Sequence, residues 1–175
     1  MVVYRKARRK DLAAFYQIYL QVFPKDSHED KPMPKSALFI KERIPFVASD
    51  SDEILGIVFA EQYYNSQNEI LLSCLGVRDE QRGKGVGRRL VLKVESWARQ
   101  NGYSAVILQC SPEMVSYYEK LGYQKRWQGN LGEVWLFEME KLVFKTDRQI
   151  EKIMFETFGV DCGQYLAEGL GENSI

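Results

Sequence analysis

Hydrophobic residues follow two different periods along the chain, and each change of period predicts a boundary between secondary-structure elements. Apolar runs of strand length, bounded by polar or glycine-containing turns, predict strands at residues 2–7, 46–49, 54–64, 69–77 and 104–110. Helical spacing of apolar residues follows the first of these runs, over residues 11–23, and the fourth, over residues 86–100. The pattern therefore predicts strands and helices in mixed order.

The segment between the first helix and the second strand has no clear period. Pro24 ends the helix, and residues 25–35 are polar and contain two prolines, so we expect a loop there. Residues 36–44 are expected to form a second short helix that ends before Pro45.

The C-terminal third begins with a helix signal. Ser and Pro at residues 111–112 are typical of a helix start, and Gly122 suits its C-terminal cap. Two apolar stretches, residues 127–130 and 134–139, predict a closing antiparallel hairpin. Residues 143–170 have helix-like spacing and predict a helical tail.

A glycine-rich basic loop joins the strand at residues 69–77 to the helix at residues 86–100. Gly83, Gly85 and Gly87 carry no Cβ atom, so several backbone N–H groups there can point at one ligand. The start of the helix adds partial positive charge. Four basic side chains surround the loop: Arg82, Lys84, Arg88 and Arg89. Together these features predict a site for a phosphorylated ligand.

Two common phosphate-binding loops do not fit this segment. A Walker loop needs GxxxxGK followed by Ser or Thr, which the sequence lacks. A dinucleotide fingerprint needs GxGxxG, whereas residues 83–87 have the spacing GxGxG. Residues 82–87 fit R/Q-x-x-G-x-G/A after a strand. A flexible surface loop in which the glycines occur by chance is the alternative.

A second motif follows downstream. Residues 118–122 read Tyr-Glu-Lys-Leu-Gly and are followed by the aromatic Tyr123. With the loop motif and the spacing between the two, the chain resembles the GNAT superfamily of N-acetyltransferases. The opening residues 5–12, Arg-x-Ala-x-x-x-Asp-Leu, are also similar to the start of that family.

The resemblance implies a GNAT fold of the α/β (α+β) class. Its central mixed, mostly antiparallel sheet would be splayed between two parallel strands, ending at Val77 and Cys110, with helices on both faces. Residues 1–142 would form the acetyltransferase domain. Residues 143–175 would form a C-terminal helical extension, packed on the same domain or on the partner subunit of a homodimer.

The same resemblance implies acetyl-CoA as co-substrate, held between the splayed strands. Backbone groups of Leu75, Gly76 and Val77 would pair with the pantetheine arm. The pyrophosphate would bind residues of the loop and helix start: Arg82, Gly83, Lys84, Gly85, Val86, Gly87 and Arg88. Ser111 stands where many relatives have an asparagine that contacts the cofactor, although a helix cap is the favoured interpretation. No metal is expected, because the sequence shows no cluster of His, Cys and carboxylate ligands.

The implied reaction is direct attack of a primary amine on acetyl-CoA in a ternary complex. Tyr118 has the position of the family's general acid and would protonate the departing thiolate, a core tyrosine being the alternative. Its neighbour Tyr117 is expected to point elsewhere and to be structural. Glu69 is the candidate general base, because some relatives have a glutamate at this offset from Gly83. Glu61 acting through water, or a water relay, is the alternative.

Other catalytic arrangements find less support in the sequence. The positions where further relatives have a base hold Ser73 and Val106. His28, the sole histidine, lies in the polar loop, and no nucleophile elbow accompanies it for a Ser-His-Asp triad.

Composition is consistent with one enzyme-sized domain, since the 175 residues are 45% hydrophobic. The formal net charge is zero, so we expect no nucleic-acid partner. The 3 cysteines are widely spaced, there is no signal-peptide core, and no run approaches about 18 apolar residues. We therefore expect a cytoplasmic protein with reduced thiols and no membrane span.

The acceptor is not specified by these motifs. Asp26, Glu29 and Asp30 in the polar loop could attract a cationic amine, although acidic loop residues are more often solvated. A polyamine, an aminoglycoside-like amine, an amino acid or a protein N-terminus fits equally well. A non-catalytic acyl-CoA-binding sensor or interaction module is the alternative function.

Overall fold

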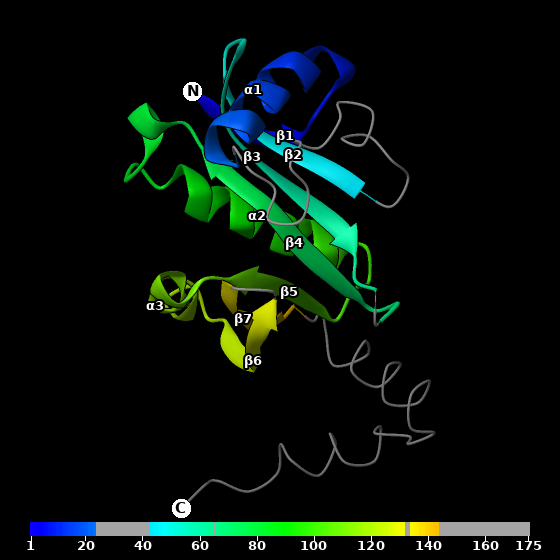
Figure 1. The fold of residues 1–175 in the computed structure, drawn as a ribbon. Coiled ribbons are helices and arrows are strands. Elements are labelled where there is room, and N and C mark those ends of the chain that lie inside the picture. The colour runs from blue at the N-terminus through cyan, green and yellow to red at the C-terminus, as the bar shows by residue number, and fades with distance from the viewer. Residues whose placement is uncertain (24–42, 65, 132–133, 144–175) are drawn as a thin grey trace, which may run out of the picture.

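A computed structural model describes residues 1–23, 43–64, 66–131 and 134–143 of the chain. These residues form one seven-stranded sheet in the order β1-β2-β3-β4-β5-β7-β6, with helices on both faces (Figure 1). The strands are β1 (Val2–Lys6), β2 (Arg43–Asp50), β3 (Glu53–Gln62), β4 (Glu69–Val77), β5 (Ala105–Cys110), β6 (Gln124–Leu131) and β7 (Val134–Leu142). The α-helices are α1 (Leu12–Val22), α2 (Val86–Gln100) and α3 (Val115–Glu119).

The pairing of the strands confirms the predicted mixed, mostly antiparallel sheet. All neighbours are antiparallel except β4 and β5, which run parallel and are connected by α2. The strand and helix predicted at residues 69–77 and 86–100 have these bounds in the structure. The loop at residues 25–35 and the helical tail lie outside the described residues.

The helix expected to end before Pro45 is partly wrong. Residues 36–42 lie outside the described part, but Arg43 and Ile44 belong to β2 and continue through Pro45. Pro45 accepts a hydrogen bond from the N–H of Ala7 at 2.8 Å, just beyond the last β1 pair. The ring nitrogen of Pro45, which has no N–H group, faces the edge of β2 that borders β1. Because β1 ends at Lys6, no strand residue there needs a hydrogen bond from this nitrogen. A proline can therefore stand inside this strand.

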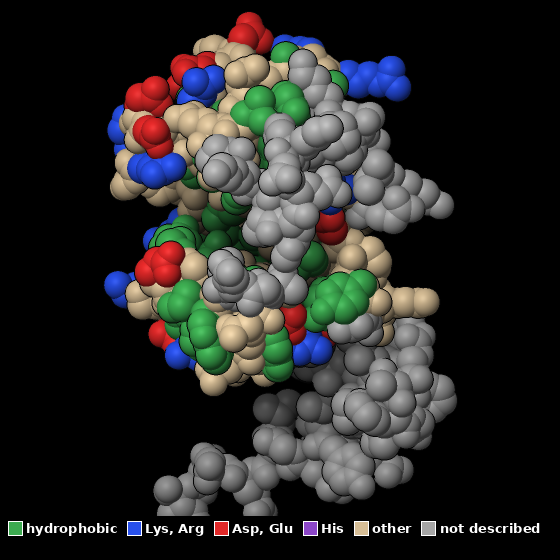
Figure 2. Space-filling view, viewed as in Figure 1, with side chains coloured by type: hydrophobic (Ala, Val, Ile, Leu, Met, Phe, Trp, Pro, Cys, Tyr) green, Lys and Arg blue, Asp and Glu red, His purple; other side chains and the backbone are tan. Residues whose placement is uncertain are grey.

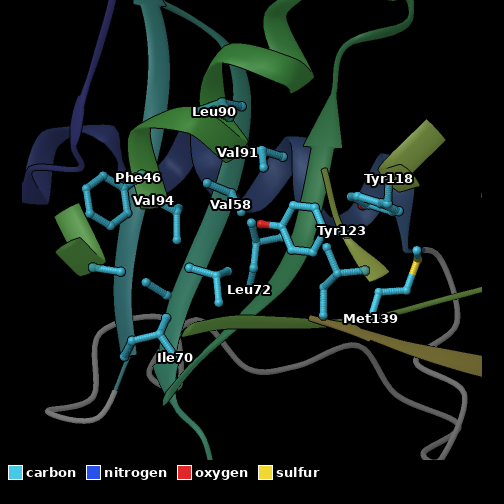
Figure 3. Close-up of a cluster of buried hydrophobic side chains, with 14 of the residues drawn as sticks. Phe46, Val58, Ile70, Leu72, Leu90, Val91, Val94, Tyr118, Tyr123 and Met139 are labelled. Carbon is cyan, nitrogen blue, oxygen red and sulfur yellow. The ribbon is translucent and has the colours of Figure 1, made fainter. Parts of the chain in front are cut away.

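The two faces of the sheet are covered by different helices. On one face α1 packs Phe15, Ile18 and Tyr19 against Ile57 and Phe59. On the other face the apolar stripe of α2 lies over a larger cluster from all the central strands (Figure 3). The predicted stripe is confirmed, because the side chains of Val86, Leu90 and Val94 are buried and Trp97 packs against them.

Gly56 brings α2 close to the sheet. A Cβ atom on this residue would lie 3.0 Å from the carbonyl oxygen of Gly76 and 3.0 Å from Cδ1 of Leu90. A contact that short with backbone would force α2 or β4 to move. The glycine therefore holds the first turns of α2 beside the end of β4, where the glycine loop lies.

A partly buried ion pair connects the end of α3 to α2. Lys141 of β7 donates hydrogen bonds to Glu95 of α2 at 2.9 Å and to the carbonyl oxygen of Leu121 at 2.7 Å. Gly122, with φ of +89°, ends α3 as predicted, and the N–H of Tyr123 bonds back to the carbonyl of Tyr118 at 3.1 Å. Residues after β5 are thereby held in place relative to the loop after β4.

The C-terminal hairpin is longer than predicted. β6 begins at Gln124 and β7 continues to Leu142, and β6 is an edge strand of the sheet. Alternation alone missed these ends because β6 is largely polar and exposed.

Candidate functional site

The parallel strands β4 and β5 separate halfway along their length. Their pairs run from Glu69 opposite Ala105 to Leu72 opposite Leu108 and then stop. Beyond that point β4 pairs only with β3, while β5 continues to pair with β7. β4 leads to the loop before α2 and β5 to α3, so these two segments border the opening between the strands (Figure 1). An extended ligand can bind an exposed strand edge of this kind through main-chain hydrogen bonds.

A β-bulge redirects β4 at the point of separation. The register with β3 shifts between Ile57 and Phe59, and Cys74 has a φ of +50°. A non-glycine residue in this backbone region is strained, and such strain is concentrated at functional sites. Leu75, Gly76 and Val77, predicted to contact the pantetheine arm, follow the bulge directly along the unpaired edge.

The glycine loop has the backbone shape of an anion cradle. Gly83 and Gly85 have φ values of +74° and +78°, which glycine adopts without cost. No atom lies within 4 Å of the Cβ position of either residue, so a side chain there would meet no steric clash. Glycine is needed at these positions for its positive φ, and its lack of a side chain leaves space for a ligand. The first helical hydrogen bond runs from the N–H of Arg89 to the carbonyl of Gly85 at 3.1 Å. The N–H groups of residues 86–88 therefore have no partner within α2.

Positive charge surrounds this cradle. The side chains of Lys84, Arg88 and Arg89 are exposed on the first turn of α2 and in the loop. Arg82 is also exposed and forms an ion pair with Asp79 at 2.9 Å. An exposed pair of this type is weak, so Arg82 can exchange that partner for an anionic ligand.

Tyr118 lies across the opening from the loop. Its side chain is 6% exposed and packs edge-on against Tyr123 at a centroid distance of 5.8 Å (Figure 3). Its ring also meets that of Tyr117 edge-on, at 5.0 Å. Burial, followed by the nearby Tyr117 and Cys110, raises the pKa of the Tyr118 phenol above its ordinary value. The phenol is therefore protonated at neutral pH, as a proton donor must be. No described residue shares a hydrogen bond with its hydroxyl.

Tyr117 does not lie apart from the site, contrary to the expectation from its helical position. A Cβ atom on Gly87 would be 3.5 Å from the hydroxyl oxygen of Tyr117. The half-buried phenol thus reaches from α3 to the first turn of α2. Its pKa is raised by burial, and the charge of Arg88 acts in the opposite direction. The residue type and its position on a predicted helix could not reveal this contact, because the contact depends on how α3 is oriented against α2.

Ser111 occupies the N-cap position, with an extended backbone, but it makes no side-chain cap hydrogen bond. Ser111 therefore has the predicted N-cap position but does not form the hydrogen bond expected of a cap. The Ser111 side chain lowers the pKa of the nearby exposed carboxyl group of Glu113. Ser111 directly follows Cys110, the last residue of β5, so it stands at the mouth of the opening.

A carboxylate and a hydroxyl meet where the strands separate. Ser73, the first β4 residue beyond the last β5 pair, donates a short hydrogen bond to Glu61 of β3. Arg43 of β2 holds the other oxygen of Glu61 at 2.9 Å. Glu61 is 18% exposed and Arg43 is 17% exposed, so this group is mostly shielded from solvent. The two side chains meet because β3 and β4 pair Phe59 with Ser73 and Glu61 with Leu71, which makes Glu61 and Ser73 diagonal neighbours on one face of the sheet.

Glu69 lies at the opposite, paired end of β4. It accepts two hydrogen bonds from Arg126 of β6, both at 3.1 Å. Arg126 also lies 3.3 Å from Glu140. Near these groups, the buried Glu138 accepts a hydrogen bond from Tyr63 at 2.8 Å. Burial and this bond raise the pKa of the Tyr63 phenol. The carboxylates give the closed end of the strand pair a negative charge that Arg126 offsets only in part.

The molecular surface is hollowed between the half that carries α1 and the half that carries α3, and hydrophobic side chains line the visible part of the hollow (Figure 2). In the described part of the chain, no group of three or more His, Cys, Asp and Glu side chains could hold a metal ion. None of the described helices has the length and apolar character needed to cross a lipid bilayer.

Comparison with known sequences identifies relatives over the middle of the chain. A family model described as the acetyltransferase (GNAT) family matches residues 12–123. The chain is 32% identical over 88 residues to glucosamine 6-phosphate N-acetyltransferase of Candida albicans, covering 46% of this chain and 57% of that protein. It is 33% identical over 89 residues to N-acetyltransferase 8B of Homo sapiens, covering 47% and 39%. The chain thus spans about half the length of the curated relatives it matches.

Solved structures are similar over more of the chain. Aminoglycoside 6'-N-acetyltransferase complexed with coenzyme A has a TM-score of 0.71 at 18% identity, covering 82% of this chain and 98% of that one. The ribosomal-protein-S18-alanine N-acetyltransferase from Escherichia coli has a TM-score of 0.67 at 15% identity, covering 83% and 96%. These likenesses concern the fold, which is the predicted one.

Proposed function

This chain belongs to the GNAT acetyltransferase family, and on that premise we propose that it transfers an acetyl group from acetyl-CoA to a primary amine. The observation that carries the proposal is the separation of β4 and β5 after Leu72 and Leu108. This separation leaves the glycine loop at the end of one strand and Tyr118 just beyond the end of the other. The ligand that fits has an anionic diphosphate, an extended amide-containing arm and a reactive thioester.

Each part of acetyl-CoA is assigned to one part of the opening. The N–H groups of residues 83–88, with Arg82 and Lys84, would bind the diphosphate, since the unpaired amides of residues 86–88 and a helix start favour anions. The unpaired edge at Leu75, Gly76 and Val77 would bond to the pantetheine arm as an added strand. Ser111, at the end of β5, would contact the arm from the other side.

The chemical step needs one proton donor and one proton acceptor. The neutral amine nitrogen attacks the thioester carbonyl carbon, the carbon–sulfur bond breaks, and the new amide nitrogen loses a proton. Tyr118 gives its phenolic proton to the departing sulfur, so that the products are the amide and the free thiol. The phenolate regains a proton from solvent through the opening.

For the proton acceptor we propose Glu61 ahead of Glu69. Glu61 is hydrogen-bonded to Ser73 at the point of separation, so a proton from the amine can pass through that hydroxyl or a water. Glu69 is four residues before Ser73 on β4, about 13 Å along the strand. Arg126 holds its carboxylate as Arg43 holds that of Glu61, so the distance from the point of separation decides the order. Glu69 remains the second candidate, because a moved Arg126 would free its carboxylate.

The distribution of charge supports an amine acceptor. Basic side chains are concentrated at the loop, whereas Glu61 lies where β4 and β5 separate and Glu69 lies at the paired end of β4. A cationic amine is therefore favoured near the point of separation, away from the basic loop. Relatives are named for glucosamine 6-phosphate, aminoglycosides and a ribosomal-protein alanine, and these amines define a first panel.

The test is release of free CoA thiol from acetyl-CoA in the presence of each amine. The panel comprises glucosamine 6-phosphate, an aminoglycoside, spermidine and a peptide with an N-terminal alanine. Turnover with at least one amine, lost in Tyr118→Phe, supports the enzyme. Tight binding of acetyl-CoA with no turnover across the panel would favour the alternative, a non-catalytic acyl-CoA sensor.

A further inference from the structure

We infer that the Tyr117 hydroxyl donates a hydrogen bond to the diphosphate of the CoA ligand and is a positioning residue of the cofactor site. The inference rests on the proposed function, because it assumes that the glycine loop receives CoA. It assigns different ends of one ligand to two adjacent tyrosines of α3: the diphosphate to Tyr117 and the sulfur to Tyr118.

The hydroxyl lies at the correct end of α2. A Cβ atom on Gly87 would be 3.5 Å from the Tyr117 hydroxyl oxygen and 3.5 Å from Cγ2 of Val77. The hydroxyl therefore lies beside the first turn of α2, where the N–H groups of residues 86–88 have no partner within the helix. Because Gly87 has no Cβ, the space between the hydroxyl and these amides stays open.

The hydroxyl also has the chemistry that a phosphate oxygen requires. Burial raises the pKa of the phenol and Arg88 opposes this only in part, so the group is a donor at neutral pH. None of the described residues shares a hydrogen bond with it, although the side chain is half-buried. A polar group in this position needs a partner from solvent or ligand.

The ring is held so that the hydroxyl keeps its direction. Tyr117 packs against the main core cluster and meets Tyr118 edge-on at 5.0 Å. The end of α3 is fixed in turn by Lys141, which bonds to the carbonyl of Leu121 and to Glu95 of α2. Little conformational entropy is then lost when the hydroxyl bonds to a ligand.

Two variants and three ligands separate this role from a structural one. Tyr117→Phe keeps the ring and removes the donor. Gly87→Ala fills the space between the hydroxyl and the amides, with its Cβ at ordinary contact distances. Binding of CoA and dephospho-CoA is measured by calorimetry, and binding of pantetheine, which has no diphosphate, by NMR titration. Thermal unfolding checks that both variants fold.

The expected result is about a tenfold loss of affinity for CoA and dephospho-CoA in Tyr117→Phe, the usual effect of one hydrogen bond to a charged group. A comparable loss is expected in Gly87→Ala, while pantetheine binds each variant as it binds the wild type. In turnover, the Tyr117→Phe loss appears chiefly as a raised KM for acetyl-CoA.

Two results would overturn the inference. One is an unchanged CoA affinity in a folded Tyr117→Phe variant, and the other is an equal loss of affinity for pantetheine. If the wild-type protein itself bound no CoA, the proposed function would fail first and the inference with it. Binding by the wild type therefore distinguishes failure of the inference from failure of the proposed function.

Discussion

Removing the hydroxyl of Tyr118 should slow acetyl transfer without weakening the fold. In Tyr118→Phe the ring keeps its edge-on contacts with Tyr117 and Tyr123, at 5.0 and 5.8 Å. The hydroxyl shares no hydrogen bond with any described residue, so no buried partner is left unsatisfied. We expect the free energy of unfolding to change by less than about 0.5 kcal/mol.

The catalytic loss should be much larger. A positioned general acid contributes about 10²- to 10⁴-fold to a rate, which corresponds to roughly 3–5 kcal/mol of activation free energy. Because the Tyr118 pKa is raised, its protonated form persists through neutral and mildly alkaline pH. The wild-type rate should therefore show no loss from this group between pH 7 and about 10, the ordinary pKa of tyrosine.

Single-turnover release of CoA thiol, measured against pH with a productive amine, tests both statements. Tyr103→Phe provides the matched control, since it removes the same atom from a partly buried tyrosine that packs on Trp97. A folded Tyr118→Phe variant that loses less than about threefold in rate would refute the general-acid role. A wild-type rate that falls with a midpoint below pH 9 would contradict the assignment of a raised pKa to the essential acid.

Three further outcomes can be checked. Glu61→Gln should lower kcat by tenfold or more, whereas Glu69→Gln should have a smaller effect; the opposite order would reassign the base. Gly85→Ala, at a φ of +78°, should cost about 1–2 kcal/mol in urea unfolding and weaken CoA binding, unlike an alanine at an exposed helical position. A hydrogen bond from Arg5 lowers the pKa of the buried Asp11 carboxyl group in the folded protein. The stability that this pair contributes is therefore fully present above about pH 4, the pKa of aspartate in the unfolded chain, and is lost as the pH falls through the lower folded pKa. Asp11→Asn should therefore cost about 2 kcal/mol at pH 7, and a difference from wild type that did not shrink by pH 3 would contradict the linkage.

Local signals in the sequence predicted most of the elements that border the proposed acetyl-CoA site. The bounds of β4 and α2 and the cap at Gly122 follow from short-range patterns of apolar residues and glycine. Pro45 misled the prediction, because whether a strand tolerates proline depends on where its neighbour ends. A single chain segment contains no information about that neighbour.

The amine side could not be predicted in the same way. Glu61 and Ser73 are 12 positions apart, and the register of β3 with β4, which pairs Phe59 with Ser73, brings them together. A shift of one residue would place Ser73 on the opposite face of the sheet. Tyr117 is a similar case, because its contact with Gly87 depends on the orientation of a short helix fixed by residues distant in sequence.

The sequence by itself determined the family, the order of the elements and the backbone shape of the loop at Gly83 and Gly85. These depend on interactions within a few residues, such as the freedom of glycine to adopt positive φ. The tertiary structure decided which side chains share the opening between β4 and β5. That choice depends on strand register, on the early end of the parallel pairing and on the packing of α3, which arise from contacts between residues far apart in the chain.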